Sequence, residues 1–280
     1  MMDYSGQRLG NYLALYMLGM GSFANVYLGR HIYLKTEVAI KILFERLDMD
    51  ATERFLLEAR FLSGQEHPHI VRMYDADVVN GVAYLTMDYV PAGTLRALHP
   101  AGGALPLSTI VGYVRQIASA LMYAHERRFM HRNLKPENVL VGEGGRLLLS
   151  DFGITLPARG TDIASVQAGG ETLAYMAPEQ LRGKPGAASD QYALAALVYE
   201  WLSGHLPFVG DTAELCGQHL FVAPPSLYQA FPELLPEVER VIFKALAKHP
   251  LQRFATVGAF AEALEDACLL SGVSRTITGG

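Results

Sequence analysis

The chain has 280 residues, half of them hydrophobic, and a net charge of −5. This length suffices for one large domain or two lobes with a sizeable core. The mild negative charge, without a basic stripe, argues against nucleic acid as the main partner. The two cysteines, Cys216 and Cys268, are far apart and match no metal spacing, so reduced thiols and a cytoplasmic location are expected.

The two ends of the chain carry no membrane signal. The start, MMDYSGQRLGNY, lacks the basic and apolar regions of a signal peptide, and the apolar run at 193–198 is too short to cross a bilayer. We therefore expect no membrane contact by this segment. The last residues, SGVSRTITGG, are typical of the start of a linker, which leaves open that the chain is the cytosolic part of a longer, membrane-anchored protein.

The first predicted strand, residues 12–20, leads into a glycine turn that holds Gly19 and Gly21, and a second strand follows with Val26. Glycines let a backbone approach a phosphate and donate N–H groups to it. A glycine pair alone favours a plain hairpin turn, and a phosphate loop is the functional alternative.

The next predicted strand, 37–43, places Lys41 inside an apolar run, where a charge is costly unless it has a partner. An edge-strand lysine that reaches water is the structural alternative. The helix expected at 51–65 supplies a carboxylate, Glu58, near the edge of its apolar face. Glu53 competes with Glu58 but lies early in the helix, where it suits the N-terminus. The apolar face of this helix comprises Phe55, Leu56, Ala59 and Leu62.

After Pro91 and Gly93 the pattern changes from strands to helices, which marks the lobe boundary. Before this break, strands are expected at 70–77 and 82–88. After it, we expect a long helix at 107–128, the polar loop HRNLKPEN at 131–138, short strands at 139–141 and 146–150, and an irregular segment at 154–176. A short helix is expected to begin at 177, and four further helices are expected at 190–204, 211–220, 235–247 and 256–269.

Several short motifs occur in one order: GxGxFA, VAIK, a helix glutamate, HRxLKPEN, DFG, APE and a late Arg253. Over about residues 12–268 the chain resembles the protein-kinase family, and HPHIV and YMAPEQ make it most similar to the bacterial, eukaryotic-like serine/threonine branch. The resemblance implies an α+β, bilobal fold. Its small, mostly β N-lobe (about 12–89) would carry one regulatory helix, and its C-lobe (about 90–268) would be larger and mostly α. Residues 1–11 would form an extension and 269–280 a linker.

The resemblance also implies ATP and Mg²⁺, with Mn²⁺ as an alternative metal. Gly19 and Gly21 would cover the phosphates, and Lys41 would bind them and pair with Glu58. Asp151 and Asn138 would hold the metal, and Lys135 would steady the γ-phosphate and favour Ser/Thr hydroxyls as acceptors. For adenine the implied contacts are Leu18, Val26 and Ala39 on one side, Leu140 on the other, Met87 at the back, and the backbone of Asp88 and Val90. Plain core packing is the alternative for these apolar residues.

Other positions would have supporting roles. Glu179 would pair with Arg253, and Asp190 would brace the backbone of the catalytic loop. His131 is expected to pack in the core rather than to carry protons. The spine implied by the family comprises His131, Phe152, Leu62 and Met73. Arg132 would bind a phosphate on the activation loop. The candidate acceptors are Thr161, Ser165 and Thr172, with Ser165 favoured for regulation and Thr172 for packing and substrate docking.

Asn133 departs from the family pattern, in which an Asp orients or accepts the proton of the substrate hydroxyl. An Asn carbonyl accepts a hydrogen bond but takes up no proton near neutral pH. General-base assistance is typically worth about 10²- to 10⁴-fold, so we expect intact ATP·Mg²⁺ binding and strongly impaired transfer. The alternative is a pseudokinase that binds nucleotide and signals without turnover, and a small-molecule phosphotransferase is disfavoured by APE.

Two further points stay open in the sequence. Asn133 fits either a natural pseudokinase or a kinase altered at one position, and the complete set of other motifs favours recent loss or deliberate change. The expected partner is a protein carrying Ser or Thr, as substrate or as signalling partner, with a homodimer as a further alternative.

Overall fold

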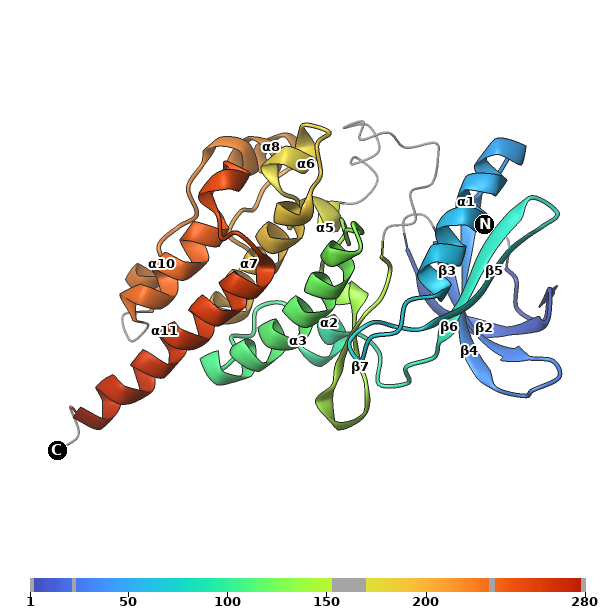
Figure 1. Ribbon diagram of the computed structural model, residues 1–280, viewed down its shortest axis with the longest axis horizontal. Helices are drawn as coiled ribbons and strands as arrows, with labels where there is room; N and C mark the ends of the chain where they lie inside the picture. The colour runs from blue at the N-terminus through green and yellow to red at the C-terminus, as the bar shows by residue number, and fades with distance from the viewer. Residues whose placement is uncertain (1–2, 22–23, 153–169, 232–234, 278–280) are drawn as a thin grey trace. The chain divides into compact units, whose positions relative to one another are not determined.

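The computed structural model describes residues 3–21, 24–152, 170–231 and 235–277 (Figure 1). Contacts divide them into two compact units, one up to Ala92 and the other from Gly93 on. A sheet and one long helix form the first unit, and the second is mostly helical. The expected α+β fold with a β-rich first lobe and a helical second lobe is confirmed.

The first unit is built on a six-stranded antiparallel sheet in the order β1-β2-β3-β4-β6-β5. Its elements are β1 (Arg8–Leu9), β2 (Tyr12–Met20), β3 (Ala24–His31), β4 (Glu37–Arg46), α1 (Met49–Ser63), β5 (Met73–Val79) and β6 (Val82–Asp88). Strand β1 was not expected, and it adds to the sheet by pairing with β2. The strand expected at 70–77 begins three residues later, and β4 continues three residues beyond the predicted end.

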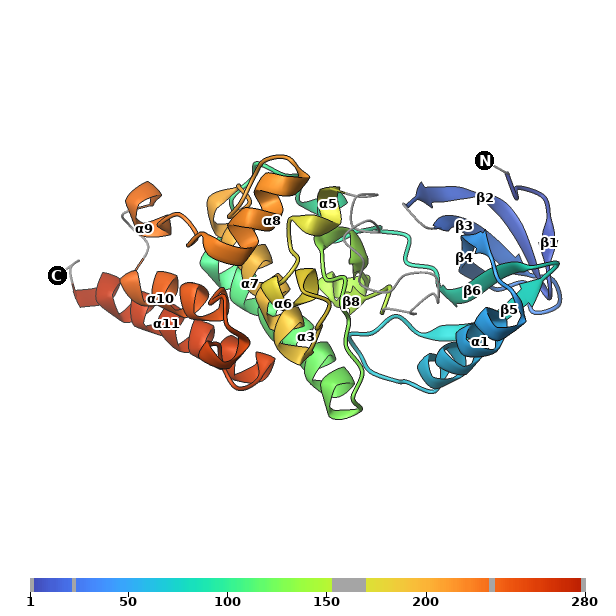
Figure 2. The same ribbon diagram turned by 90° about the horizontal axis from the view of Figure 1, so that it is seen from above.

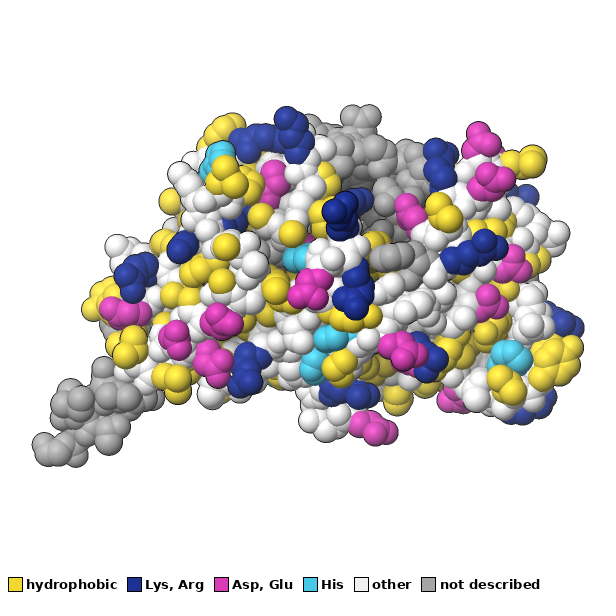
Figure 3. Space-filling view, viewed as in Figure 1, with side chains coloured by type: hydrophobic (Ala, Val, Ile, Leu, Met, Phe, Trp, Pro, Cys, Tyr) yellow, Lys and Arg dark blue, Asp and Glu magenta, His cyan; other side chains and the backbone are white. Residues whose placement is uncertain are grey.

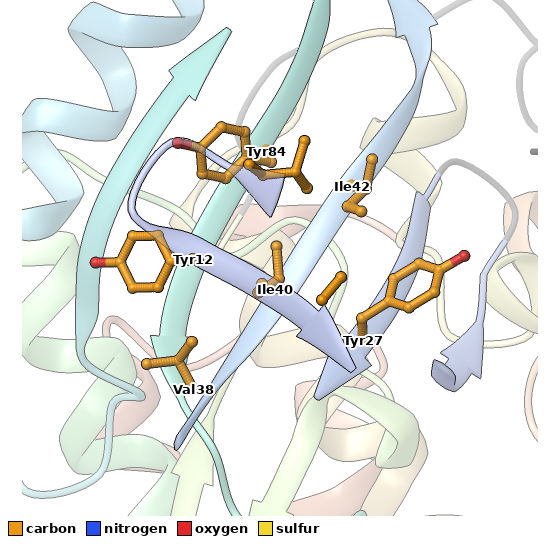
Figure 4. Close-up of a cluster of buried hydrophobic side chains, with 8 residues drawn as sticks. Tyr12, Tyr27, Val38, Ile40, Ile42 and Tyr84 are labelled. Carbon is orange, nitrogen blue, oxygen red and sulfur yellow. The ribbon is translucent and has the colours of Figure 1, made fainter. Parts of the chain in front are cut away.

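Successive residues of a strand point to opposite faces, so the sheet has two different surfaces. One face carries a buried cluster in which side chains from neighbouring strands lie together (Figure 4): Leu9, Tyr12, Ala14, Tyr27, Val38, Ile40, Ile42 and Tyr84. On the other face, Leu43, Ala83 and Leu85 pack against Phe55 and Ala59 of α1. The helix therefore covers the face to which the odd-numbered residues of β4 point, Lys41 among them.

Helix α1 begins slightly earlier and ends slightly earlier than predicted. Its N-cap is Asp48, whose side chain accepts a hydrogen bond from the Ala51 backbone N–H at 2.8 Å and so satisfies one of the free donors at the helix start. Phe55, Ala59 and Leu62 are buried, which confirms the predicted apolar face.

The second unit surrounds one buried helix, α7 (Ala187–Ser203), as the apolar sequence predicts. Helices α3, α10 and α11 pack against α7, and α11 lies alongside α3 and α10 (Figures 1 and 2). The other elements are α2 (Leu95–Leu98), α3 (Leu107–Glu126), a 3-10 turn (Pro136–Asn138), β7 (Val139–Val141), a second 3-10 turn (Glu143–Gly145), β8 (Leu147–Leu149), α5 (Gly170–Leu173), α6 (Pro178–Leu181), α8 (Thr212–Phe221), α9 (Leu227–Ala230), α10 (Pro236–Ala245), a third 3-10 turn (Pro250–Gln252) and α11 (Val257–Ile277).

The end of the chain differs from the prediction in one respect. Helix α11 continues to Ile277, whereas the sequence predicted a helix end near 269 and the start of a linker there. The short helices α2, α5 and α9 were not predicted, because four-residue helices are too short to show a period.

The surface of the described residues mixes both signs of charge. On the face drawn in Figure 3, Lys and Arg side chains are interspersed with Asp and Glu side chains, and hydrophobic side chains lie among them both singly and in small groups. Among the residues that the structure describes, none of the helices combines the length and the apolar character that crossing a bilayer requires.

His219 is expected to make the stability of the second unit sensitive to acid. Its ring on α8 is fully buried, and Nδ1 lies 2.9 Å from the Tyr192 hydroxyl. Burial, followed by the charge of Lys248, lowers the pKa of His219 to about 4. The unfolded chain therefore binds a proton between about pH 6.5 and pH 4 that the folded chain does not, and stability falls as pH falls through this window.

We expect His219→Gln to remove this acid sensitivity, because the amide still accepts from Tyr192 but does not titrate. The parent should lose about 3 kcal/mol relative to the variant between pH 7 and pH 4. Urea unfolding of both proteins across this range measures the difference. If the free energy of unfolding of the parent and of His219→Gln falls equally with pH, His219 is not the group that causes the acid sensitivity.

Candidate active site

The loop 131–138 is anchored on the buried helix α7 through Asp190. Its carboxylate accepts the backbone N–H of His131 at 2.9 Å and that of Arg132 at 2.8 Å. The same carboxylate lies 2.7 Å from Nε2 of His125 on α3. Arg132 has a φ of +63°, a conformation unfavourable for a side chain with a Cβ, and the bond to its N–H helps hold it. The predicted bracing by Asp190 is confirmed, and His125 is an additional partner that the sequence did not reveal.

His131 is a packing residue, as predicted. It is fully buried, its Nε2 lies 2.9 Å from the Ser150 carbonyl oxygen, and its ring centroid lies 4.7 Å from that of Phe152. Burial lowers its pKa, which favours the neutral ring. The predicted contact of His131 with Phe152 is present, with the two rings tilted by 51° rather than stacked. Leu62 and Met73, the other two predicted members of the spine, belong to the first unit.

Asn133 lies at a small pocket in the second unit. Its backbone carbonyl accepts the Asn138 side-chain amide at 2.8 Å, which fixes the turn of the loop. Its side-chain oxygen is buried and, among the described residues, has no hydrogen-bond partner. The pocket is lined by Arg132, Asn133, Leu134, Thr172, Tyr175, Met176, Gln180 and Ala193. A buried acceptor without a partner costs about 1–3 kcal/mol, so this oxygen favours a donor such as a hydroxyl group.

Asn138 and Asp151 fit a hard cation. Because the Asn138 amide nitrogen is bonded to the loop, its side-chain oxygen is the atom left to face a ligand. The Asn138 backbone carbonyl accepts from both N–H and Oγ of Ser150, at 2.9 and 3.1 Å, and Asp151 follows directly with a φ of +59°. Amide and carboxylate oxygens are the ligands that Mg²⁺ prefers, so the donor set matches the predicted metal.

Lys135 is half-buried just before the 3-10 turn, and its carbonyl accepts the Asn138 backbone N–H at 2.9 Å. Thr172 is half-buried on α5 and lines the Asn133 pocket, in agreement with a packing position, and its role in substrate docking stays a prediction. Thr161 and Ser165 lie outside the described residues.

Strand pairing gathers the candidate nucleotide residues of the first unit on one face of the sheet. Val26 pairs with both Gly19 and Lys41, and Ala39 pairs with Met87. Residues paired across antiparallel strands point to the same face, so these side chains share the face that α1 covers. The sequence separates these residues by up to 68 positions (87 − 19), and the register brings them together.

The fold excludes one alternative for Lys41 and bears on the choice of its partner. Strand β4 is central, between β3 and β6, so Lys41 is not on an edge strand. On α1, Glu58 is half-buried whereas Glu53 is exposed, which favours Glu58 over Glu53 as the residue that faces the sheet. A pairing of Lys41 with Glu58 remains a prediction.

The glycine turn is a hairpin, since Met20 pairs with Asn25 and the Gly21 N–H donates to the Ala24 carbonyl at 2.9 Å. Its use as a phosphate loop stays a prediction. Leu18, next to Gly19 on β2, is exposed, which suits a contact with a ligand as well as with solvent.

Asp88 is the last residue of β6, and both its backbone and its side chain are hydrogen-bonded. Its backbone N–H donates to the Arg72 carbonyl at 3.0 Å, and its carboxylate accepts from the Tyr74 hydroxyl. An adenine contact at Asp88 would therefore have to use its carbonyl oxygen. Val90 and Met87 are half-buried in the first unit, and Leu140 is half-buried on β7 of the second unit.

The predicted pairing of Glu179 with Arg253 is present. Two parallel bonds of 2.7 and 2.8 Å join the guanidinium to both carboxylate oxygens. Ser189 also donates to Glu179, and Arg253 donates to the carbonyls of Ala188 and Ala247. The pair locks α6 to the start of α7 and to the turn that precedes α11.

A family model described as the protein kinase domain matches residues 12–266 of this chain. The chain belongs to the protein kinase family.

Curated relatives within the family are similar over nearly the whole chain. The serine/threonine-protein kinase PrkC of Bacillus subtilis is 37% identical over 256 residues, which cover 90% of this chain and 40% of PrkC. The serine/threonine-protein kinase PknF of Mycobacterium tuberculosis is 35% identical over 274 residues, 92% of this chain and 56% of PknF. The chain thus spans about half the length of these relatives.

Solved kinase structures share the fold. The kinase domain of Mycobacterium tuberculosis PknI matches with a TM-score of 0.76 and 29% identity, covering 96% of this chain and 100% of that domain. Rad53 residues 1–466, solved in complex with AMP-PNP, matches with a TM-score of 0.76 and 27% identity, covering 90% of this chain and 64% of that one.

One group of polar residues in this kinase fold was not predicted from the sequence. Arg96 bonds to Glu137, Glu200 and Tyr175, which come from distant parts of the chain. A signal was present, because Glu200 is a carboxylate within the apolar run of α7 and needed a buried partner. Gln180 was also missed. Its side chain donates to the Arg132 carbonyl at 2.8 Å and accepts the Ala177 N–H, which links α6 to the catalytic loop.

Proposed function

We propose that this chain is a serine/threonine protein kinase domain that binds ATP with Mg²⁺ and transfers the γ-phosphate to protein Ser or Thr, with transfer strongly impaired by Asn133. The observation that carries the proposal is the loop held by Asp190, which places Asn133 at a pocket and bonds Asn138 to Ser150, the residue before Asp151. The curated relatives are named serine/threonine-protein kinases, which supports the same reaction class.

Nucleotide binding is supported by the shared face of the sheet. Gly19, Val26, Ala39, Lys41 and Met87 would contact ATP there, with Gly19 near the phosphates and Lys41 bound to them. Lysine beside phosphate supplies a compact positive charge without requiring proton transfer. The presence of AMP-PNP in the Rad53 structure shows that a related fold accepts a nucleotide.

The remaining nucleotide positions follow the family pattern. We assign them as Leu18, Gly21, Asp88, Val90 and Leu140, with Glu58 as the partner of Lys41. This assignment requires only backbone contacts at Asp88 and Val90, so the Asp88 carboxylate remains available for its bond with the Tyr74 hydroxyl.

Asn138 and Asp151 would hold Mg²⁺, with Mn²⁺ as the alternative. The bound ion would neutralise charge on the phosphate oxygens. Lys135, half-buried beside the 3-10 turn, would steady the γ-phosphate. These residues position and stabilise charge, which accounts for most of the catalysis of phosphoryl transfer.

Asn133 limits the step at the substrate hydroxyl. Its buried side-chain oxygen would accept the hydroxyl hydrogen bond and orient the group. The amide takes up no proton near neutral pH, so the hydroxyl proton has no base at this position. The test is transfer of labelled phosphate from ATP to a generic basic protein by this chain and by Asn133→Asp, with Lys41→Met in the Asn133→Asp background as the control that removes the phosphate contact.

A second candidate function is a nucleotide-binding signalling module without turnover, and Asn133 itself favours it. This function predicts that ATP with Mg²⁺ raises the melting temperature while neither the Asn133 protein nor its Asn133→Asp variant transfers phosphate. An unchanged melting temperature with ATP and Mg²⁺ would remove the nucleotide-dependent form of this candidate. For both candidates we propose a cytoplasmic location and a protein partner carrying Ser or Thr, with a homodimer as the alternative.

A further inference from the structure

Arg96 is the centre of a polar network that the proposed chemistry does not use. Its Nη1 and Nη2 donate to the two oxygens of Glu200 at 2.7 and 3.3 Å, and its Nε donates to Glu137 at 2.9 Å. Nη2 also donates to the Tyr175 hydroxyl at 2.6 Å, and that hydroxyl donates to Glu200 at 2.6 Å. The four residues come from α2, the 3-10 turn of the catalytic loop, the segment after α5, and α7.

The network is mostly hidden from water and is fixed at one end. Glu200 and Tyr175 are buried, and Glu200 belongs to α7, the buried helix at the centre of the second unit. Burial opposes the charge on Arg96, but hydrogen bonds with Glu200 and Glu137 raise its pKa above the ordinary value. Burial and Glu200 raise the pKa of Tyr175 as well, so its hydroxyl stays protonated. Charge-assisted bonds of this kind are strong and directional.

Two members of the network connect Arg96 to the site. Tyr175 lines the pocket at Asn133. Glu137 lies within the 3-10 turn, directly before the candidate metal ligand Asn138. The side-chain bonds of Arg96 in the described part of the chain reach Tyr175 and Glu137, so its influence on the pocket and on the metal ligands would pass through these two residues.

We propose that Arg96 is a positioning residue of the transfer site, which holds Tyr175 as a wall of the acceptor pocket and fixes the turn Pro136–Asn138. This inference rests on the proposed function, because it assigns the pocket at Asn133 to the protein substrate. Arg96 also supplies the only positive charge that the structure records on Glu137 or Glu200 within the described residues. Without it, two neighbouring carboxylates would repel each other and Tyr175 would lose one of its two partners.

The kinetic test uses the Asn133→Asp protein as parent. Arg96→Met should raise KM for a peptide substrate about tenfold, which corresponds to about 1.4 kcal/mol, close to the low end for one charged hydrogen bond, with KM for ATP and kcat nearly unchanged. Tyr175→Phe should raise the peptide KM in the same direction. Arg115→Met is the matched control, because Arg115 makes an exposed ion pair with Glu265 at 3.2 Å, and it should change nothing.

Chemical rescue separates positioning from a general loss of structure. Arg96→Ala leaves a space of guanidinium size between the carboxylates, so millimolar methylguanidine should restore the peptide KM. The same compound should not rescue Arg96→Met, because the longer side chain fills that space. Failure of methylguanidine to improve Arg96→Ala, together with an unchanged KM in Arg96→Met, would overturn the inference.

A second readout does not depend on activity. In the chain with Asn133 as it stands, Arg96→Met should speed amide hydrogen exchange in peptides covering 134–141 and 172–177 and leave α3, α10 and α11 unchanged. Faster exchange throughout the second unit, or no change in these two segments, would contradict a positioning role. If the Asn133→Asp parent itself transfers no phosphate, the proposed function fails, and the exchange pattern still decides whether Arg96 positions these segments.

Discussion

Replacing Asn133 with Asp is expected to raise the rate of phosphate transfer about 10²- to 10⁴-fold, because it restores a proton acceptor at the substrate hydroxyl. Asn133 already lines the pocket, on a backbone that Asp190 and Asn138 hold in place. Asp has nearly the same shape, so the change adds a base without requiring the loop to move. The measurement is the single-turnover rate at saturating ATP, Mg²⁺ and protein substrate.

The matched control for this variant is Asn133→Ala, which removes both the base and the hydrogen-bond acceptor. We expect its transfer rate to lie below that of the Asn133 protein, since the hydroxyl would no longer be oriented. If Asn133→Asp transfers phosphate as slowly as Asn133→Ala, this position does not limit the reaction.

Arg253→Met is expected to cause the largest loss of stability of any single change considered, about 3–5 kcal/mol, because it leaves a buried carboxylate without its cation. The Arg253 side chain is 0% exposed and that of Glu179 is 11% exposed. Burial opposes ionisation of Glu179, yet the bonds from Arg253 keep its pKa below the ordinary value. For a chain of this size, a loss of that order lowers the melting temperature by about 10 °C.

Thermal unfolding and urea titration of Arg253→Met measure this loss. The exposed ion pair between Arg115 and Glu265, with side chains 65% and 38% exposed, offers the control. Arg115→Met should change stability by less than about 1 kcal/mol. In a double-mutant cycle, Glu179→Leu should recover part of the loss in the Arg253→Met background, since it removes the unpaired charge. A full loss in Arg253→Met without such recovery would mean that the carbonyl contacts of Arg253, and not the ion pair, stabilise the fold.

Many of the helices and strands could be predicted from the sequence, because their hydrophobic residues follow a regular period or form long apolar runs. The loose alternation in residues 12–20 matches β2, the strand expected at 82–88 matches β6, and the apolar run after Asp190 matches the buried α7. Strand β1 could not be read, because a two-residue strand such as Arg8–Leu9 has no period and depends on its partner β2. The extra turns of α11 were missed because Gly and Ser near 271 suggest a linker, whereas the helix continues through them.

Some contacts of the candidate site were also predicted from the sequence and others were not. Asp190, His131 and the pair Glu179–Arg253 were predicted through motif order and are present as contacts. The network around Arg96 was not predicted: Glu200 within the apolar run of α7 indicated a buried partner, but Arg96 lies 104 residues away and only packing identifies it as that partner. The roles of Lys41 and Glu58 toward nucleotide stay predictions, which the register of β4 and the burial of Glu58 support.

We propose that nucleotide binding and proton removal are separable in this chain, because Asn133 would affect the second and the residues proposed for the first are all present in the sequence. Calorimetric titration of ATP in the presence of Mg²⁺ into the Asn133 protein and into Asn133→Asp tests this most directly. The predicted result is binding of both proteins with the same affinity, despite their different transfer rates. Binding by the Asn133→Asp variant alone, or by neither protein, would contradict the claim that Asn133 impairs only the proton step.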